Sequence, residues 1–134
     1  MTQTDQGMSR NSGSVNVVVR QLDSDAILVA AAGEVDLRTH GDVKSALFDA
    51  LAPPSPMVLI ADFSRVSFFD SCGISTVVET HQRAQTVGTD FRIVGTHRAV
   101  RLPLTITGVD RYLDLYDDRE SAYQQPNPMP LTST

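Results

Sequence analysis

A continuously apolar segment is followed within ten residues by a helical pattern, and this order restricts the fold more than any other feature. Residues Met57 to Ala61 show no polar alternation, which is typical of a strand covered on both faces of a sheet. A helix is predicted from about Ser71 to Val87, with a helical pattern at Ile74, Val77, Val78 and His81. Gly88 ends this helix where a left-handed backbone costs glycine nothing. Ser71 is therefore expected at an exposed turn between a buried strand and a helix.

The rest of the chain alternates strand and helix patterns in a similar way. Further strands are predicted at 15–19, 26–32, 91–94 and 112–116, and further helices at 39–51, 97–102 and 117–123. The first two of these strands would form an antiparallel hairpin. Thr39 with Asp42 is expected to start a helix as a capping box, and Pro103 is expected to end or distort the third helix.

This alternation predicts an α/β fold. We expect a small mixed, mainly parallel sheet of about four or five strands, with about four helices packed mostly on one face. The domain is expected to span residues 14–123. Residues 1–13 are rich in small polar residues and residues 124–134 in proline, so both ends are expected to be disordered.

Charge and composition narrow the class of partner. The formal net charge is −5 and the chain has no basic block, which disfavours nucleic acid or an anionic membrane. No apolar run approaches the ~18–20 residues that span a bilayer. A single cysteine, Cys72, fits a reducing compartment, and the polar start is unlike a secretory signal. We therefore expect a cytoplasmic domain.

Motifs for catalysis are missing from the sequence. It has neither of the glycine-rich loops that cradle nucleotide phosphates, and Phe69 replaces the first glycine of a hydrolase nucleophile elbow. The histidines at 40, 81 and 97 are scattered, and with one cysteine they give no metal-ligand spacing. His81 is expected to be packed. We therefore predict no enzyme, no cofactor and no metal.

The Ser71 hydroxyl has three possible roles at a helix start. It could be a nucleophile, Asp70 or Ser71 could cap the helix, or Ser71 could accept a phosphate that the helix N-terminus would tolerate. Phe68 and Phe69 are expected to pin this turn. Gly73 would allow a partner backbone to approach closely, or would relieve crowding against the sheet.

Three segments resemble the STAS domains, and the likeness is greatest to bacterial anti-sigma factor antagonists. They are Gly33 to Leu37, Asp62 to Gly73 and Thr107 to Leu113. The resemblance covers about residues 15–123, and the Asp70-Ser71-Cys72-Gly73 segment is its most specific part. Cys72 departs from the family, which usually has Ser or Thr there. It is expected to act as a small residue or as a thiol with a lowered pKa.

The resemblance implies a protein that captures an anti-sigma factor of the GHKL serine kinase type and so frees a sigma factor. The kinase would phosphorylate Ser71 and a PP2C-type phosphatase would reverse the reaction. The candidate partner contacts are Asp36, Asp70, Ser71, Cys72, Gly73, Ser75 and Thr76. Two alternatives stay open: a non-switching STAS module of a lipid-transport or stress-signalling assembly, and a small hydrolase that uses Ser71.

Overall fold

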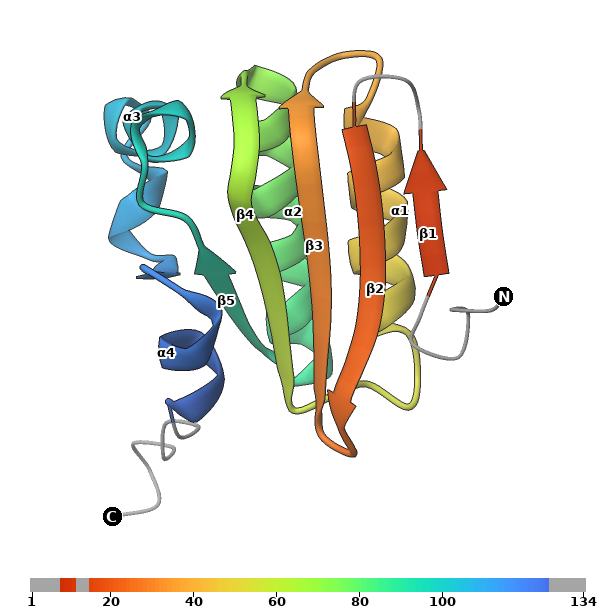
Figure 1. Ribbon diagram of the computed structural model, residues 1–134. Coiled ribbons are helices and arrows are strands. Elements are labelled where there is room, and N and C mark those ends of the chain that lie inside the picture. Colours follow the sequence, from red (N-terminus) through yellow and green to blue (C-terminus); the bar gives the residue numbers. More distant parts are fainter. Residues whose placement is uncertain (1–7, 12–14, 126–134) are drawn as a thin grey trace.

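The computed structural model describes residues 8–11 and 15–125. Its described strands form one sheet in the order β1-β2-β3-β4-β5-β6 (Figure 1). The strands are β1 (Met8–Asn11), β2 (Val15–Asp23), β3 (Ala26–Val35), β4 (Val58–Phe69), β5 (Asp90–Val94) and β6 (Asp114–Tyr116). The helices are α1 (His40–Leu51), α2 (Ser71–Val87), α3 (Arg98–Ile106) and α4 (Arg119–Gln124), with a 3-10 turn, η2, at Val109–Arg111.

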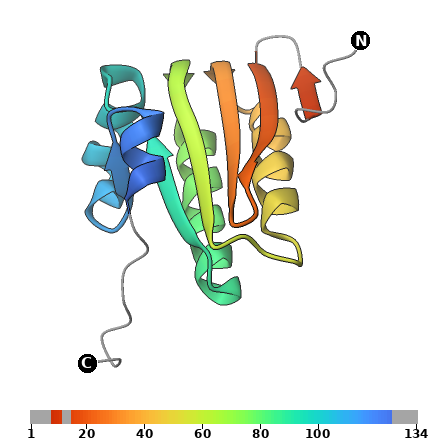
Figure 2. The ribbon, with the colours of Figure 1, turned by 60° about the horizontal axis from the view of Figure 1, so that its bottom comes forward.

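The sheet is mixed, as predicted. The β1–β2 and β2–β3 pairs are antiparallel, and the β3–β4, β4–β5 and β5–β6 pairs are parallel. Helices α1 and α2 cover one face, while α4 packs on the opposite face beside β5 (Figure 2). The larger core lies between α1, α2 and the sheet, and a smaller one lies under α4.

The two long helices form as their patterns predict. The apolar stripe of α1, from Val43 to Leu51, is buried against the sheet. Helix α2 has the predicted bounds, and Gly88 ends it in the left-handed region at φ 79°, with its N–H donating to the carbonyls of Ala84 and Gln85. These two helices set the position of the Ser71 turn.

Strand β1 lies in the segment that was expected to be disordered, and it takes the sheet beyond the expected four or five strands. Its pairing with β2 aligns Met8 with Val19 and Asn11 with Asn16. Residues Met8–Asn11 show no apolar alternation, so the sequence pattern did not reveal this strand. It pairs with the backbone groups that β2 offers at its outer edge. Gln124 was also expected to be disordered, but it is the last residue of α4. Residues 1–7, 12–13 and 126–134 of the two predicted disordered ends lie outside the described part of the chain.

Two further expectations need correction. Strand β4 continues to Phe69, well beyond the predicted end at Ala61, because its pairing with β3 continues through two irregularities in register. Helix α3 continues to Ile106 through Pro103, whose missing N–H leaves one intrahelical bond unmade. Burial of Val100 and Leu104 on either side of Pro103 offsets that loss.

Candidate functional site

The carboxyl ends of β3 and β4 lie side by side and bring two candidate residues together. Val35 pairs with Phe69 in the parallel ladder, and the Asp70 N–H donates to the Val35 carbonyl at 3.3 Å. Asp36 and Asp70 each follow directly after these strand ends, at the top of Figure 1. Two carboxylates therefore flank the point where α2 begins.

Ser71 is the first residue of α2, and its side chain is exposed. The helix cap is Asp70, whose carboxylate accepts the Cys72 N–H at 2.8 Å. Because Asp70 caps the helix, the Ser71 hydroxyl is not needed for that role. It makes no hydrogen bond to any residue in the described ranges, and it is exposed.

Phe69 fixes the turn from inside the core. Its side chain is 4% exposed and its ring packs against Phe63 with centroids 5.5 Å apart. Phe68 does not share this role, because half of its side chain is exposed. Only the second of the two aromatics therefore pins the strand-to-helix connection.

Gly73 and Thr76, two of the candidate partner contacts, are buried in the structure. Gly73 is buried, and a Cβ there would lie 2.8 Å from the Phe69 ring, which supports the crowding explanation for this glycine. Thr76 is 2% exposed, and its hydroxyl donates to the Cys72 carbonyl at 2.9 Å. Ser75 is exposed and stays a candidate.

Asp36 organises the loop between β3 and α1. Its carboxylate accepts the N–H groups of Arg38 at 3.0 Å and Thr39 at 3.1 Å. Thr39 does not form the predicted capping box: it is fully buried, and its hydroxyl donates to the Glu34 carbonyl at 2.6 Å. Asp36 is therefore half-buried and held in place near the start of α2.

The pKa of the Cys72 thiol is raised, which contradicts the expectation that the helix N-terminus would lower it. Desolvation contributes most to the rise, followed by the negative charges of Asp70 and Asp36. The side chain is half-buried and unpaired with other cysteines. A small residue that fits the turn is the better description of Cys72.

Two exposed apolar side chains at this end of the sheet were not predicted as site residues. Leu37, in the loop after β3, is 75% exposed, and Phe68, near the end of β4, is 50% exposed. Leu37 follows directly after Asp36 in the sequence, and this adjacency to a candidate carboxylate could have identified it. Exposed apolar side chains beside carboxylates are typical of surfaces that bind another protein.

The histidines do not form a catalytic group with Ser71 among the described residues. His81 packs its ring against Tyr112 with centroids 5.5 Å apart, in keeping with its predicted packed role. His97 directs Nε2 to the Val66 carbonyl at 2.7 Å. Within the described ranges, no cluster of His, Cys, Asp and Glu side chains is placed to hold a metal.

The sequence profile of the STAS domain matches residues 16–122 of this chain. The chain belongs to the STAS domain family. The predicted resemblance is confirmed, and the α/β sheet with its four helices is the STAS fold. None of the helices in the described ranges is long and apolar enough to cross a membrane.

Within that family, the chain is similar to anti-sigma factor antagonists. It is 28% identical over 110 residues to the anti-sigma-F factor antagonist RsfB of Mycobacterium tuberculosis, covering 81% of this chain and 87% of RsfB. It is 25% identical over 114 residues to RsfA of the same organism, covering 83% of this chain and 87% of RsfA. The crystal structure of an anti-sigma factor antagonist from Mycobacterium paratuberculosis superposes with a TM-score of 0.75 at 27% identity, covering 87% of this chain and 96% of that one.

Proposed function

We propose that this chain is an anti-sigma factor antagonist whose binding is switched by phosphorylation of Ser71. In its unphosphorylated form it binds an anti-sigma factor of the GHKL serine kinase type and so frees a sigma factor for transcription. A PP2C-type phosphatase restores this form. The relatives are named as anti-sigma-F factor antagonists, and this likeness supports the same class of partner in the cytoplasm.

The observation that carries the proposal is the free hydroxyl of Ser71. Asp70 caps α2 through the Cys72 N–H, so modification of Ser71 would break no described hydrogen bond. Phe69 and Gly73 hold the backbone on either side by close packing. A kinase would therefore meet an exposed hydroxyl on a fixed helix start.

A phosphate on Ser71 would change the charge of the surface and leave the fold intact. It adds about −1.5 to −2 charges at pH 7, and the positive end of the α2 dipole favours an anion at this position. The carboxylates of Asp36 and Asp70 lie at the same end of the sheet. The summed negative charge would repel a partner that binds the uncharged hydroxyl, so the switch would act on binding.

Catalysis of the transfer belongs to the kinase. The Ser71 Oγ attacks the γ-phosphorus of ATP, an Oγ–P bond forms and the bond to the β-phosphate oxygen breaks. The hydroxyl proton would pass to a base of the kinase, and ADP would be the leaving group. In the reverse direction, water attacks the phosphorus in the phosphatase and inorganic phosphate leaves Ser71. This chain supplies the acceptor and no catalytic group.

Two exposed apolar side chains at this end of the sheet would supply contact area. Phe68 lies three residues before Ser71 in the sequence and Leu37 follows Asp36, and aromatic anchors at the centre of an interface commonly carry much of the binding energy. Ser75 is exposed one turn further along α2. We therefore expect Phe68→Ala to weaken binding of the anti-sigma factor without preventing folding.

Incubation with a candidate anti-sigma kinase and ATP, followed by mapping of phosphate by mass spectrometry, tests the proposal. Phosphate is expected on Ser71 and none on Ser75, which is the matched exposed serine of the same helix. Ser71→Ala should block modification and keep binding, while Ser75→Ala should change neither. If the cognate kinase and ATP leave Ser71 without phosphate, and if binding of the anti-sigma factor is the same before and after this incubation, the non-switching STAS module is favoured instead.

A further inference from the structure

The face of the sheet opposite α1 and α2 is only half covered. Helix α4 packs Ala122 over Leu28, Ile60 and Val94, but it is only six residues long. Beside it, over β2, β3 and the upper part of β4, a groove of about 730 Å³ remains among the described residues. This volume is within the ~300–1,000 Å³ typical of small-molecule sites.

The floor of this groove follows from the strand register. Val18 faces Ala30 across the β2–β3 pair, and Asn16 faces Ala32. Paired residues project from the same face of a sheet, so these small side chains form one surface. The apolar run of β3 is typical of a strand covered on both faces, yet Ala30 and Ala32 are only half-buried. A sheet face that contacts only water usually carries polar side chains, whereas the floor of this groove is largely apolar.

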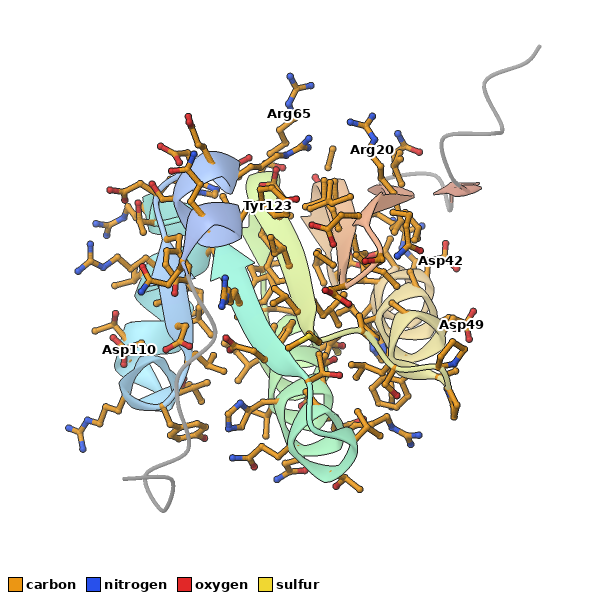
Figure 3. All side chains as sticks on the ribbon, turned by 90° about the horizontal axis from the view of Figure 1, so that it is seen from below. Arg20, Asp42, Asp49, Arg65, Asp110 and Tyr123 are labelled. Atoms are coloured by element: carbon orange, nitrogen blue, oxygen red, sulfur yellow. The ribbon has the colours of Figure 1, made fainter. Side chains whose placement is uncertain are left out.

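Two arginines border this floor. Arg20 lies on β2, and Arg65 pairs with Ala32 from β4; both line the groove and both are exposed. Figure 3 shows them projecting from the face that α1 and α2 leave open. Neither forms an ion pair or hydrogen bond with a residue in the described ranges, whereas Arg119 is already paired with Asp62.

One acidic residue of the groove, Asp62, lies on β4 and is paired with Arg119, while the other acidic residues lie on the opposite side beside α4. Asp118 precedes α4 and Glu120 lies within it, and both accept hydrogen bonds from α4 itself. Asp117, next to Asp118, accepts the Thr96 hydroxyl. This distribution of charge favours an anionic group near β2 and β4 and disfavours one beside α4.

We infer that this groove binds an amphipathic anion, with its apolar body on Val18, Ala30 and Ala32 and its carboxylate or phosphate head near Arg20 and Arg65. The apolar floor removes hydrocarbon from water, and the guanidinium groups form charge-assisted hydrogen bonds with the head. Ser71 is not among the lining residues, so this site is separate from the proposed phosphorylation site.

Titration with four small probes, followed by amide NMR, tests the inference on the whole chain. Decanoate and decyl phosphate, kept below micelle-forming concentrations, share one apolar body and differ in the head. Decanol lacks the charge and inorganic phosphate lacks the body. We expect decanoate or decyl phosphate to shift the amides of 16–20 and 30–32, with decanol at least about fivefold weaker and inorganic phosphate weakest. The ratio of the dissociation constants of decanoate and decyl phosphate identifies the preferred head group.

Matched double variants separate this site from general charge effects. Arg20→Gln with Arg65→Gln should weaken binding of the preferred anion by at least about fivefold and leave decanol unchanged. Arg101→Gln with Arg111→Gln removes the same charge from exposed positions outside the groove. This control variant should bind the preferred anion and decanol as the wild type does. The inference would be overturned if both double variants lost the same affinity for the anion, or if decanol bound as tightly as the anions. It would also be overturned if no probe shifted the amides of 16–20 and 30–32. Shifts of the same amides with protein concentration alone would overturn it in favour of a second copy on this face.

Discussion

The ring of Phe69 occupies the space beside Gly73 that any larger side chain would need. A Cβ added at Gly73 would lie 2.8 Å from Cδ1 and Cε1 of that ring. Phe69 is itself held by its contact with Phe63 in the core. Because Phe69 ends β4 and Gly73 lies in the first turn of α2, this contact fixes how the chain presents Ser71 between them.

We predict that Gly73→Ala destabilises the domain. Alanine would gain ~1 kcal/mol in helix propensity, but overpacking against Phe69 costs about 1–3 kcal/mol. Gly41→Ala is the matched control, because a Cβ at Gly41 in α1 meets nothing within 4 Å. Urea unfolding should show a net loss for Gly73→Ala and no loss for Gly41→Ala. Equal stability of the two variants would contradict the packing argument.

Asp70 is expected to stabilise α2 through its side-chain oxygen. Asp70→Ala removes the acceptor for the Cys72 N–H and should lower the free energy of unfolding by ~1 kcal/mol. Asp70→Asn keeps an acceptor oxygen and should lose less. Thermal unfolding of the two variants checks this order, and equal losses for Asp70→Asn and Asp70→Ala would show that the charge, not the hydrogen bond, matters.

Cys72 is expected to react slowly with alkylating agents at neutral pH. Burial raises the pKa of its thiol above the ordinary 9.0, and the charges of Asp70 and Asp36 raise it further. The rate of iodoacetamide modification should therefore reach half its maximum above pH 9.0. Asp70→Asn should move that midpoint to lower pH, because one negative charge is removed. A wild-type midpoint well below 9.0 would contradict this account.

The pairing of Asp62 with Arg119 predicts a loss of stability in acid. Burial alone would raise the pKa of Asp62, but hydrogen bonds from Ser64 and Arg119 outweigh it and hold the pKa below the ordinary 3.8. The folded state therefore favours the carboxylate, and this stabilisation is lost as pH falls through the lowered pKa. Asp62→Asn should cost about 1–2 kcal/mol at pH 7. The difference from wild type should shrink below pH ~4 in unfolding experiments, and a constant difference would contradict the assignment.

Local patterns were enough to place the phosphorylation candidate. The predicted bounds of α2 and its glycine end are observed, because helix spacing and the terminal Gly88 are encoded within one segment. The position of Ser71 at the helix start followed from the same pattern. Strand β1 could not be predicted in this way, because its pairing depends on the exposed edge of β2.

The buried face of α2 was predicted less well. Of the expected stripe of Ile74, Val77, Val78 and His81, Val77 is buried in the core and Ile74 and Val78 pack against it. The other fully buried residues of α2 were not predicted, and they are Gly73, Thr76, Thr80 and Ala84. Thr76 and Thr80 donate their hydroxyls to carbonyls one turn earlier, so each can be buried without an unsatisfied polar group. Residue type alone does not reveal this internal pairing, and for this reason the burial of Thr76 was not predicted.

The affinity of the cognate anti-sigma factor for this chain, before and after phosphorylation of Ser71, tests the central proposal most directly. Calorimetric titration should show tight binding of the unmodified chain and at least about tenfold weaker binding of the phosphorylated chain. Far-UV circular dichroism should be the same for both forms, because the helix start tolerates the charge. Equal affinity of the two forms, with Ser71 fully phosphorylated, would contradict the proposed switch.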